Sequence, residues 1–217
     1  MKIACIICDH GGREELIKFA SFQLQQQTRW PDAIYTIGPP QLQPNGSVDL
    51  VARLKLGYEM AKRDGMDFVL IIEDDFYGPD YIQRFLPYMN FDFVGQDYTY
   101  YYQLKQRAWA RFDHKYRSSL FTTGFKVSAL NNWNWSDLRP DLAMVDIKLW
   151  DYAKRRTKAF IDTGAIGIKH GIGVCGGKGH LISMHNKDQD MQWLKEKVSE
   201  DAFEFYQELS EKLHEIR

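Results

Sequence analysis

The stretch "FVLIIEDDFYGPDY", residues 68–81, joins five apolar residues to three adjacent carboxylates, Glu73, Asp74 and Asp75. A short apolar run that ends in polar residues predicts a buried strand, which we place at 67–72. Neighbouring carboxylates repel one another, so either solvent screens them or a cation lies among them. Carboxylates held at the end of a buried strand are hard oxygen ligands, of the kind that Mg²⁺ or Mn²⁺ prefers. The alternative is a solvated strand end without a ligand.

Composition predicts one globular domain over residues 1–217. The chain has 44% hydrophobic and 26% charged residues, which is ordinary for a soluble protein. Its formal net charge of −1 argues against coating nucleic acid or anionic membranes by bulk charge, although a local basic patch remains compatible with it. The sequence shows neither a membrane-length apolar run nor a signal-peptide pattern, so we expect a cytoplasmic protein, in the host cytoplasm if it is viral.

Cys5 and Cys8 lie in "IACIIC", whose apolar context predicts a buried strand. Residues three apart in a strand point to opposite faces of the sheet, so these two thiols are not expected to share a metal. Reduced thiols are the default in a cytoplasm.

The first half of the chain alternates predicted strands with predicted helices. The strands are expected at 2–8, 32–38, 67–72 and 91–98, with helices from about Glu14, Val48 and Pro79. This β-α-β order predicts a mostly parallel α/β sheet with helices on both faces. Ligands of such sheets bind at the carboxyl ends of the strands, where Asp9, Gly38 and the three carboxylates fall.

The second half is less regular. We expect a strand and a short helix over 120–133, a helix over 144–156, and a strand that runs into a glycine-rich loop over 165–180. From Gln189 onward, apolar residues recur every three or four positions, which predicts an amphipathic helix packed on the domain.

Two segments resemble the glycosyltransferases of the GT-A fold, a Rossmann-like fold, and are most similar to the large inverting family two. Residues 3–28, "IACIICDHGGREELIKFASFQLQQQT", are similar to the family's opening strand, short polar turn and helix ending in Gln-Thr. Residues 57–85 are similar to its helix, apolar strand, acidic D-x-D-type motif and following Pro-Asp-Tyr. The second half matches only in outline.

The resemblance implies a nucleotide-sugar donor, with a UDP-sugar favoured, and Mn²⁺ or Mg²⁺ on its diphosphate. Residues 1–98 would form the donor half and residues 99–217 the acceptor half. Asp75 would hold the metal, or Asp74 if the register shifts by one, and Asp74 or Glu73 would contact the ribose and base edge. The other residues expected to bind the donor are Asp9, Arg13, Arg53 and Lys55. The family often has an acidic residue after the second strand, where this chain has Gly38, so the base stays open.

An inverting transferase needs a general base that deprotonates the acceptor hydroxyl. The family supplies it from an acidic residue that opens a helix in the second half, and "MVDIKLWDYAKR" is similar, with Asp146 as the candidate and Asp151 in reserve. The alternative for Asp146 is a carboxylate stabilised by the helix dipole.

The glycine-rich segment "KHGIGVCGGKGH", 169–180, leaves the backbone free to approach a ligand. Lys169 and Lys178 could contact phosphates, and the segment would act as a lid over the diphosphate. The resemblance also implies that a histidine could complete the coordination of the metal, as in some members of this fold: His170 is the first choice, and His180 or His185 is the alternative. Each of these is otherwise an ordinary surface histidine.

Residues 98–117 interleave aromatic and basic side chains. Aromatic rings stack on sugars or bases, and Arg and Lys meet phosphates, so we expect an acceptor surface here. Its candidate residues are Tyr98, Tyr101, Arg107, Trp109 and Arg111. The acceptor would be a glycan, lipid-linked or not, or a nucleic acid such as a hydroxymethylated base in viral DNA. The alternative is a core strand with a solvated basic helix.

Together these features predict a metal-dependent glycosyltransferase. A nucleotidyltransferase of similar α/β fold is the nearest enzymatic alternative, because it also uses a parallel sheet and acidic metal ligands. A non-catalytic module that binds nucleic acid or glycan is the third hypothesis, and the aromatic-basic segment is its main support.

Overall fold

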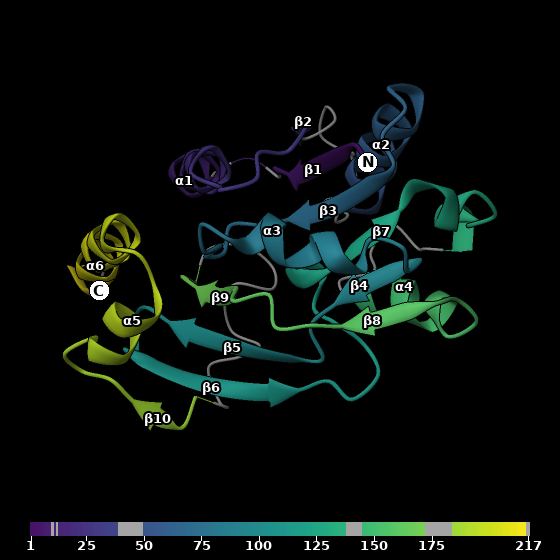
Figure 1. The fold of residues 1–217 in the computed structure, drawn as a ribbon. Coiled ribbons are helices and arrows are strands. Elements are labelled where there is room, and N and C mark those ends of the chain that lie inside the picture. The colour runs from purple at the N-terminus through teal and green to yellow at the C-terminus, as the bar shows by residue number, and fades with distance from the viewer. Residues whose placement is uncertain (10, 12, 39–49, 138–144, 172–183, 216–217) are drawn as a thin grey trace.

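The computed structural model describes residues 1–9, 11, 13–38, 50–137, 145–171 and 184–215, and they form a mixed α/β structure with two sheets (Figure 1). The six-stranded sheet has the order β2-β1-β3-β7-β4-β8, and the four-stranded sheet the order β10-β6-β5-β9. The strands of the larger sheet are β1 (Ile3–Cys8), β2 (Ala33–Ile37), β3 (Phe68–Ile72), β4 (Phe93–Gly95), β7 (Gly124–Lys126) and β8 (Lys158–Phe160). Those of the smaller sheet are β5 (Tyr98–Gln103), β6 (Ala108–Asp113), β9 (Ile166–Lys169) and β10 (Asn186–Lys187).

The larger sheet is mixed, so the prediction of a mostly parallel sheet is wrong. β1 pairs in parallel with β2 and β3, as expected. β4 also pairs in parallel with β8, a strand that the sequence did not predict. β7, however, lies antiparallel between β3 and β4. A parallel connection needs a crossover of a dozen residues or more, usually a helix. The chain between β4 and β7, residues 96–123, contains the β5–β6 hairpin and the 3₁₀ turn η2 (Leu120–Thr122) but no α-helix, so it lacks the usual crossover and β7 runs antiparallel to both neighbours.

The predicted fourth strand, 91–98, is two strands in different sheets. β4 ends at Gly95 and β5 begins at Tyr98, and the buried Gln96 lies between them. The Gln96 amide N–H donates to Ser118 Oγ (3.0 Å), and its side-chain oxygen accepts hydrogen bonds from Thr163. Gln96 therefore lies where the backbone leaves the larger sheet and enters the smaller one. The aromatic-basic segment that follows is the β5–β6 hairpin.

Helices cover both faces of the larger sheet, as predicted. α1 (Glu14–Gln25) and α3 (Tyr81–Phe85), which η1 (Leu86–Tyr88) continues, pack on one face. α2 (Leu50–Arg63), η3 (Val127–Leu130) and α4 (Val145–Ala153) pack on the other, with η4 (Trp135–Asp137) alongside. Cys5 and Cys8 point into these two different cores, which confirms that they do not share a site.

The C-terminal segment forms two helices instead of the single predicted one. α5 (Gln192–Lys197) is followed by Val198, whose backbone is extended, and then by α6 (Glu200–Glu215). Glu200 and Asp201 lie in the first turn of α6, where carboxylates interact favourably with the helix dipole, so a new helix begins here. α6 lies beside α1, with the rings of Phe19 and Phe205 stacked at 4.0 Å (Figure 1). Among the described residues, no helix is long and apolar enough to cross a membrane.

The two sheets meet just after the acidic stretch. The Phe76 amide donates to the Ile166 carbonyl (3.0 Å), and the Ile166 amide donates to the Phe76 carbonyl (3.1 Å). This bridge brings the start of β9 alongside the chain that leaves β3. The carboxylates of residues 73–75 therefore lie at the junction of the two sheets.

A substitution at Gly124 tests how closely the core side chains pack against β7. A Cβ added there would lie 2.6 Å from the Phe68 ring and 2.7 Å from the Leu70 side chain, both fully buried. We expect Gly124→Ala to lower the free energy of unfolding by about 1–3 kcal/mol, measured by urea denaturation, because the core must shift. Gly38→Ala is the matched control, since nothing lies within 4 Å of its added Cβ. Equal stability of the two variants would contradict the packing described.

Candidate functional site

The candidate site lies where the strand order of the larger sheet reverses. The chain passes from β1 through α1 to β2 on one side, and then through α2 to β3 on the other side of β1. Crevices for ligands form at the carboxyl ends of strands at such a switch point. Asp9 and Arg13 follow β1 there, and the three carboxylates follow β3.

Asp74 contacts two side chains, the guanidinium of Arg13 and the imidazole of His170. Its Oδ2 accepts hydrogen bonds from Arg13 Nη1 (2.5 Å) and from His170 Nε2 (2.9 Å). Burial alone would raise the pKa of Asp74, but the His170 hydrogen bond and the Arg13 charge hold that pKa at about 2. Asp74 is therefore a charged carboxylate with both partners on one oxygen.

Asp75 is held by the backbone of the second sheet. Its Oδ1 accepts a hydrogen bond from the Ile168 amide of β9 (2.6 Å), and its carbonyl accepts one from Gln23 Nε2 (3.0 Å). Only 2% of Asp75 is exposed. Burial raises its pKa to about 6, against the opposing effect of the Lys169 charge. This carboxylate is thus the one most fixed within the fold.

Glu73 has the highest pKa of the three carboxylates. Burial and the nearby charge of Asp75 raise the pKa of Glu73 to about 8, so its side chain carries a proton at neutral pH. Its backbone amide donates to the Tyr77 hydroxyl (2.8 Å). Neighbouring carboxyl groups with separated pKa values are typical of sites that use acid and base forms side by side.

Lys169 supplies the second positive charge. Burial disfavours its charged form, but the negative charge of Asp75 raises its pKa above the usual lysine range. Its Nζ lies 4.6 Å from the centre of the Tyr101 ring, a cation–π contact. Arg13, Lys169 and the proton on Glu73 together relieve the repulsion among the three adjacent carboxylates.

The metal ligands expected from the sequence were Asp74 or Asp75 together with His170. Among the described residues, no group of three or more His, Cys, Asp and Glu side chains is arranged to hold a metal ion. Asp74 and His170 nevertheless fit as a pair, because two neighbouring octahedral ligands about 2.1 Å from one ion lie about 3.0 Å apart. Their atoms are 2.9 Å apart. Mg²⁺ usually completes its shell with waters and substrate phosphates. Of the two registers, the geometry favours Asp74.

The other residues expected to bind the donor lie in varied surroundings. Asp9 Oδ1 accepts a hydrogen bond from the Gly11 amide (2.8 Å), which shapes the turn after β1. On α2, Arg53 is buried and Lys55 is exposed. His185 is exposed beside β10. Lys178, His180 and most of the expected lid lie outside the described residues.

The expected acceptor residues divide into three groups. Trp109 stacks on Trp193 of α5 at 4.5 Å, and Arg107 donates to the Gln189 carbonyl (3.1 Å), so both bind the C-terminal segment to the hairpin. Tyr98 and Arg111 form a cation–π pair at 4.3 Å. This pair is more open to solvent than Arg107 and Trp109 are, because Arg111 is exposed and Tyr98 half-buried. Tyr101 points to Lys169 instead.

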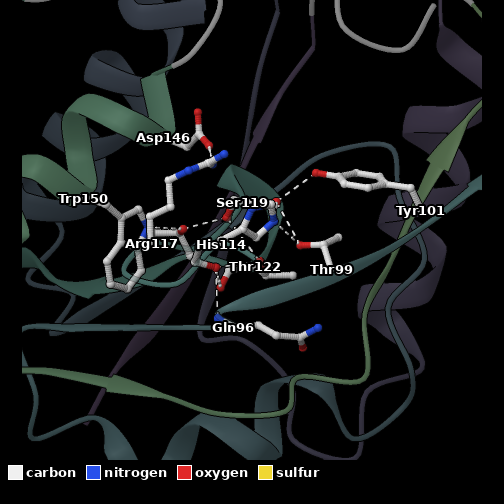
Figure 2. Close-up of polar contacts among 11 residues, drawn as sticks. Gln96, Thr99, Tyr101, His114, Arg117, Ser119, Thr122, Asp146 and Trp150 are labelled. Atoms are coloured by element: carbon white, nitrogen blue, oxygen red, sulfur yellow. Dashed lines mark hydrogen bonds and ion pairs between the residues drawn. The ribbon is translucent and has the colours of Figure 1, made fainter. Parts of the chain in front are cut away.

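Asp146 and Asp151 differ sharply as candidate bases. Asp146 lies in the first turn of α4, is ion-paired with Arg117 and has a pKa raised by burial (Figure 2). Asp151 is exposed on the same helix, and its hydrogen bond with Lys154 (2.8 Å) lowers its pKa. A raised pKa suits proton acceptance near neutral pH, so Asp146 is the better candidate.

Sequence reasoning missed a polar cluster that contains His114, Ser119 and Thr99. Figure 2 shows these side chains together with Tyr101, close to the Arg117–Asp146 pair. All of them lie within residues 99–119, on β5, directly after β6 and directly before η2. No local spacing pattern in the sequence connects them.

The chain matches no protein-family model and no curated protein.

The raised pKa of Glu73 predicts that the free energy of unfolding depends on pH. The folded protein binds more protons than the unfolded chain between the ordinary carboxyl pKa of 4.5 and the folded value of about 8, so stability falls as pH rises through this window. We expect Glu73→Gln to reduce the loss of unfolding free energy between about pH 5 and pH 8.5 by about 1 kcal/mol or more.

The measurement is urea denaturation at both pH values. Glu208→Gln, an exposed change on α6, is the control and should behave like the wild-type protein. An equal loss in the wild-type protein and Glu73→Gln would show that Glu73 is charged in the folded state.

Proposed function

We propose that this protein is a metal-dependent glycosyltransferase of GT-A-like fold, which transfers a sugar from a nucleotide-sugar, with a UDP-sugar favoured, to an acceptor hydroxyl with inversion. The observation that carries the proposal is the pairing of Asp74 with His170, flanked by Arg13 and Lys169, at the switch point of the sheet. The resemblance of residues 3–28 and 57–85 to family two supports the same assignment.

The charges of the site suit a diphosphate and a divalent cation. Asp74 and His170 would hold Mn²⁺ or Mg²⁺, which would neutralise the charge that develops on the leaving diphosphate. Arg13 and Lys169 are the cations nearest to the carboxylates, and a guanidinium recognises phosphate oxygens well. Asp75, which is fixed by β9, would keep Lys169 charged and in place.

The proposed chemistry is a displacement at the anomeric carbon. The acceptor oxygen forms a bond to that carbon, the bond to the diphosphate oxygen breaks, and the acceptor proton passes to the Asp146 carboxylate. Burial raises the pKa of Asp146, and Arg117 fixes its orientation. The Tyr98–Arg111 pair supports an acceptor that presents both a stacking face and polar groups, which fits a glycan or a hydroxymethylated base in DNA.

Binding of the donor nucleotide tests the carboxylate site. We expect UDP with Mn²⁺, at a hundred times its Kd, to raise the melting temperature by roughly 5–10 °C, and UDP alone to have a much smaller effect. Asp74→Asn should abolish the manganese-dependent part. Asp151→Asn, an exposed carboxylate with its own lysine partner, is the matched control and should keep it.

A panel of other nucleoside diphosphates in the same assay would identify the base. The melting temperature of each variant without ligand shows whether it folds. No shift with any nucleotide would contradict the donor site, and release of pyrophosphate with transfer of a nucleotide would indicate a nucleotidyltransferase.

A substitution of Asp146 tests catalysis separately from binding of the donor. We expect Asp146→Asn to lower kcat for sugar transfer by about 10²–10⁴-fold, because the acceptor proton loses its base, and to leave the Kd for UDP unchanged. The measurement is UDP release in the presence of glycan and hydroxymethylated-DNA acceptors, with Asp151→Asn as the control. Full activity of Asp146→Asn would rule out its role as the base.

A further inference from the structure

A glutamine of α1 lies buried against the chain that follows the three carboxylates. Gln23 is only 5% exposed and belongs, with Ala20 and Leu24, to the buried face of α1. A polar side chain on such a face costs free energy unless it is hydrogen-bonded. Gln23 Nε2 donates to the Asp75 carbonyl (3.0 Å), and its Oε1 accepts a hydrogen bond from the Tyr77 amide (2.8 Å). Both polar groups of the side chain are therefore bonded.

The partners of Gln23 fix the direction of both hydrogen bonds. A backbone carbonyl can only accept and a backbone amide can only donate, so the side-chain nitrogen must face Asp75 and the side-chain oxygen must face Tyr77. Exchanging the two atoms would set oxygen against oxygen and hydrogen against hydrogen. The orientation of the Gln23 amide therefore follows from the backbone alone.

Residues 75–77 are bonded like one step of a strand between two neighbouring strands. In an extended chain, the amide and carbonyl of one residue point to one side, and the carbonyl before it and the amide after it point to the other. On one side, Phe76 pairs with Ile166 of β9 through both of its backbone groups (3.0 and 3.1 Å). On the other side, the preceding carbonyl and the following amide meet the side chain of Gln23. This side chain thus takes the place of a second neighbouring strand.

This pairing determines where the Asp75 carboxylate lies. The Asp75 carbonyl is held from α1 by Gln23, and Asp75 Oδ1 accepts a hydrogen bond from the Ile168 amide of β9 (2.6 Å). The backbone and the side chain of one residue are therefore fixed by two different elements. Lys169 and His170 follow directly in the chain, so the same contacts set their position beside the carboxylates.

Gln27 makes the same kind of contact further along the chain. Its Nε2 donates to the Gly78 carbonyl (2.7 Å), its Oε1 accepts from the Ile82 amide (3.0 Å), and 2% of the residue is exposed. Gln27 therefore resembles Gln23 in burial and in its bonds to the backbone, but it holds the start of α3 instead of the acidic stretch. A comparison of the two glutamines separates a positioning role from a structural one.

We propose that Gln23 is a positioning residue of the candidate site, whose side-chain amide replaces a neighbouring strand beside residues 75–77 and thereby holds the Asp75 carboxylate on the Ile168 amide. The effect on nucleotide binding rests on the proposed function, whereas the placement of Asp75 does not.

The first test detects both hydrogen bonds of Gln23 in the wild-type protein, by NMR scalar couplings across hydrogen bonds. We expect a coupling between the Tyr77 amide nitrogen and the side-chain carbonyl carbon of Gln23, and another between Gln23 Nε2 and the Asp75 carbonyl carbon. The bond from the Phe76 amide to the Ile166 carbonyl (3.0 Å) is the internal reference. A coupling for this reference, with none for Gln23, would overturn the proposal.

The second test shows whether Gln23 places the Asp75 carboxylate. A short hydrogen bond to a carboxylate moves an amide proton downfield and slows its exchange with solvent. In Gln23→Met, which removes the donor and the acceptor at similar side-chain length, we expect the Ile168 amide signal to move upfield and to exchange about tenfold faster. Gln27→Met should leave the Ile168 amide unchanged, although it also loses a donor and an acceptor.

The matched control is Gln25→Met, the same change at an exposed position of α1, which should behave like the wild-type protein. Equal changes of the Ile168 amide in Gln23→Met and Gln27→Met would indicate general destabilisation and overturn the positioning role, and so would no change in either. If Gln23→Met does not fold, Gln23→Glu takes its place with the same expectation, because it keeps the acceptor and loses the donor to the Asp75 carbonyl.

The third test asks whether the positioning matters for the donor. With Mn²⁺ present, at a temperature where all variants are folded, we expect Gln23→Met to weaken UDP binding about tenfold and Gln27→Met to leave it unchanged. Wild-type affinity in Gln23→Met, or equal weakening in Gln27→Met, would overturn the link to the donor site. If the wild-type protein bound no nucleotide, the proposed function would fail, and the Ile168 amide would still decide the role of Gln23.

Discussion

The hydrogen bond from the Ile168 amide to the Asp75 carboxylate is the contact on which the candidate site depends. It joins the end of β3 in the larger sheet to β9 in the smaller one, next to the backbone bridge between Phe76 and Ile166. A buried carboxylate without such a donor would carry a large desolvation cost. With it, β9 is fixed across the acidic stretch, and Lys169 and His170 arrive beside the carboxylates as a result.

This arrangement also explains how three adjacent carboxylates are tolerated. Asp74 stays charged because Arg13 and His170 contact it, Asp75 is stabilised by an amide and by Lys169, and Glu73 keeps its proton. A fold that only needed to end a strand would use one polar residue here. Each of the three carboxyl groups thus has its own compensating contact, drawn from β1, β9 and their flanking segments. Under the proposed function, a cation and a diphosphate would meet these same groups.

The sequence predicted this region well where the signal is local. The apolar run of β3 and the acids after it were predicted from the local pattern. Arg13 and His170 were singled out through the family resemblance as donor and metal candidates, whereas their contacts with Asp74 were not predicted. The antiparallel direction of β7 could not be predicted, because three residues carry no directional pattern and their neighbours in the sheet decide it. The cluster around Ser119 could not be predicted either, because its hydroxyl and imidazole groups meet only once two strands and a 3₁₀ turn have folded together.

The shared oxygen of Asp74 has a mechanistic consequence under the proposed function. Arg13 and His170 contact the same Oδ2, so a divalent cation that approaches this oxygen must displace at least one of them. His170 can turn from hydrogen-bond donor to ligand through Nε2, whereas a guanidinium always carries its protons and cannot ligate. If a cation bound this oxygen, Arg13 would therefore be the group to move, and the oxygens of a diphosphate would offer it a negative charge in place of the carboxylate. Binding of metal and nucleotide would then be coupled, because each removes the cost that the other would meet alone.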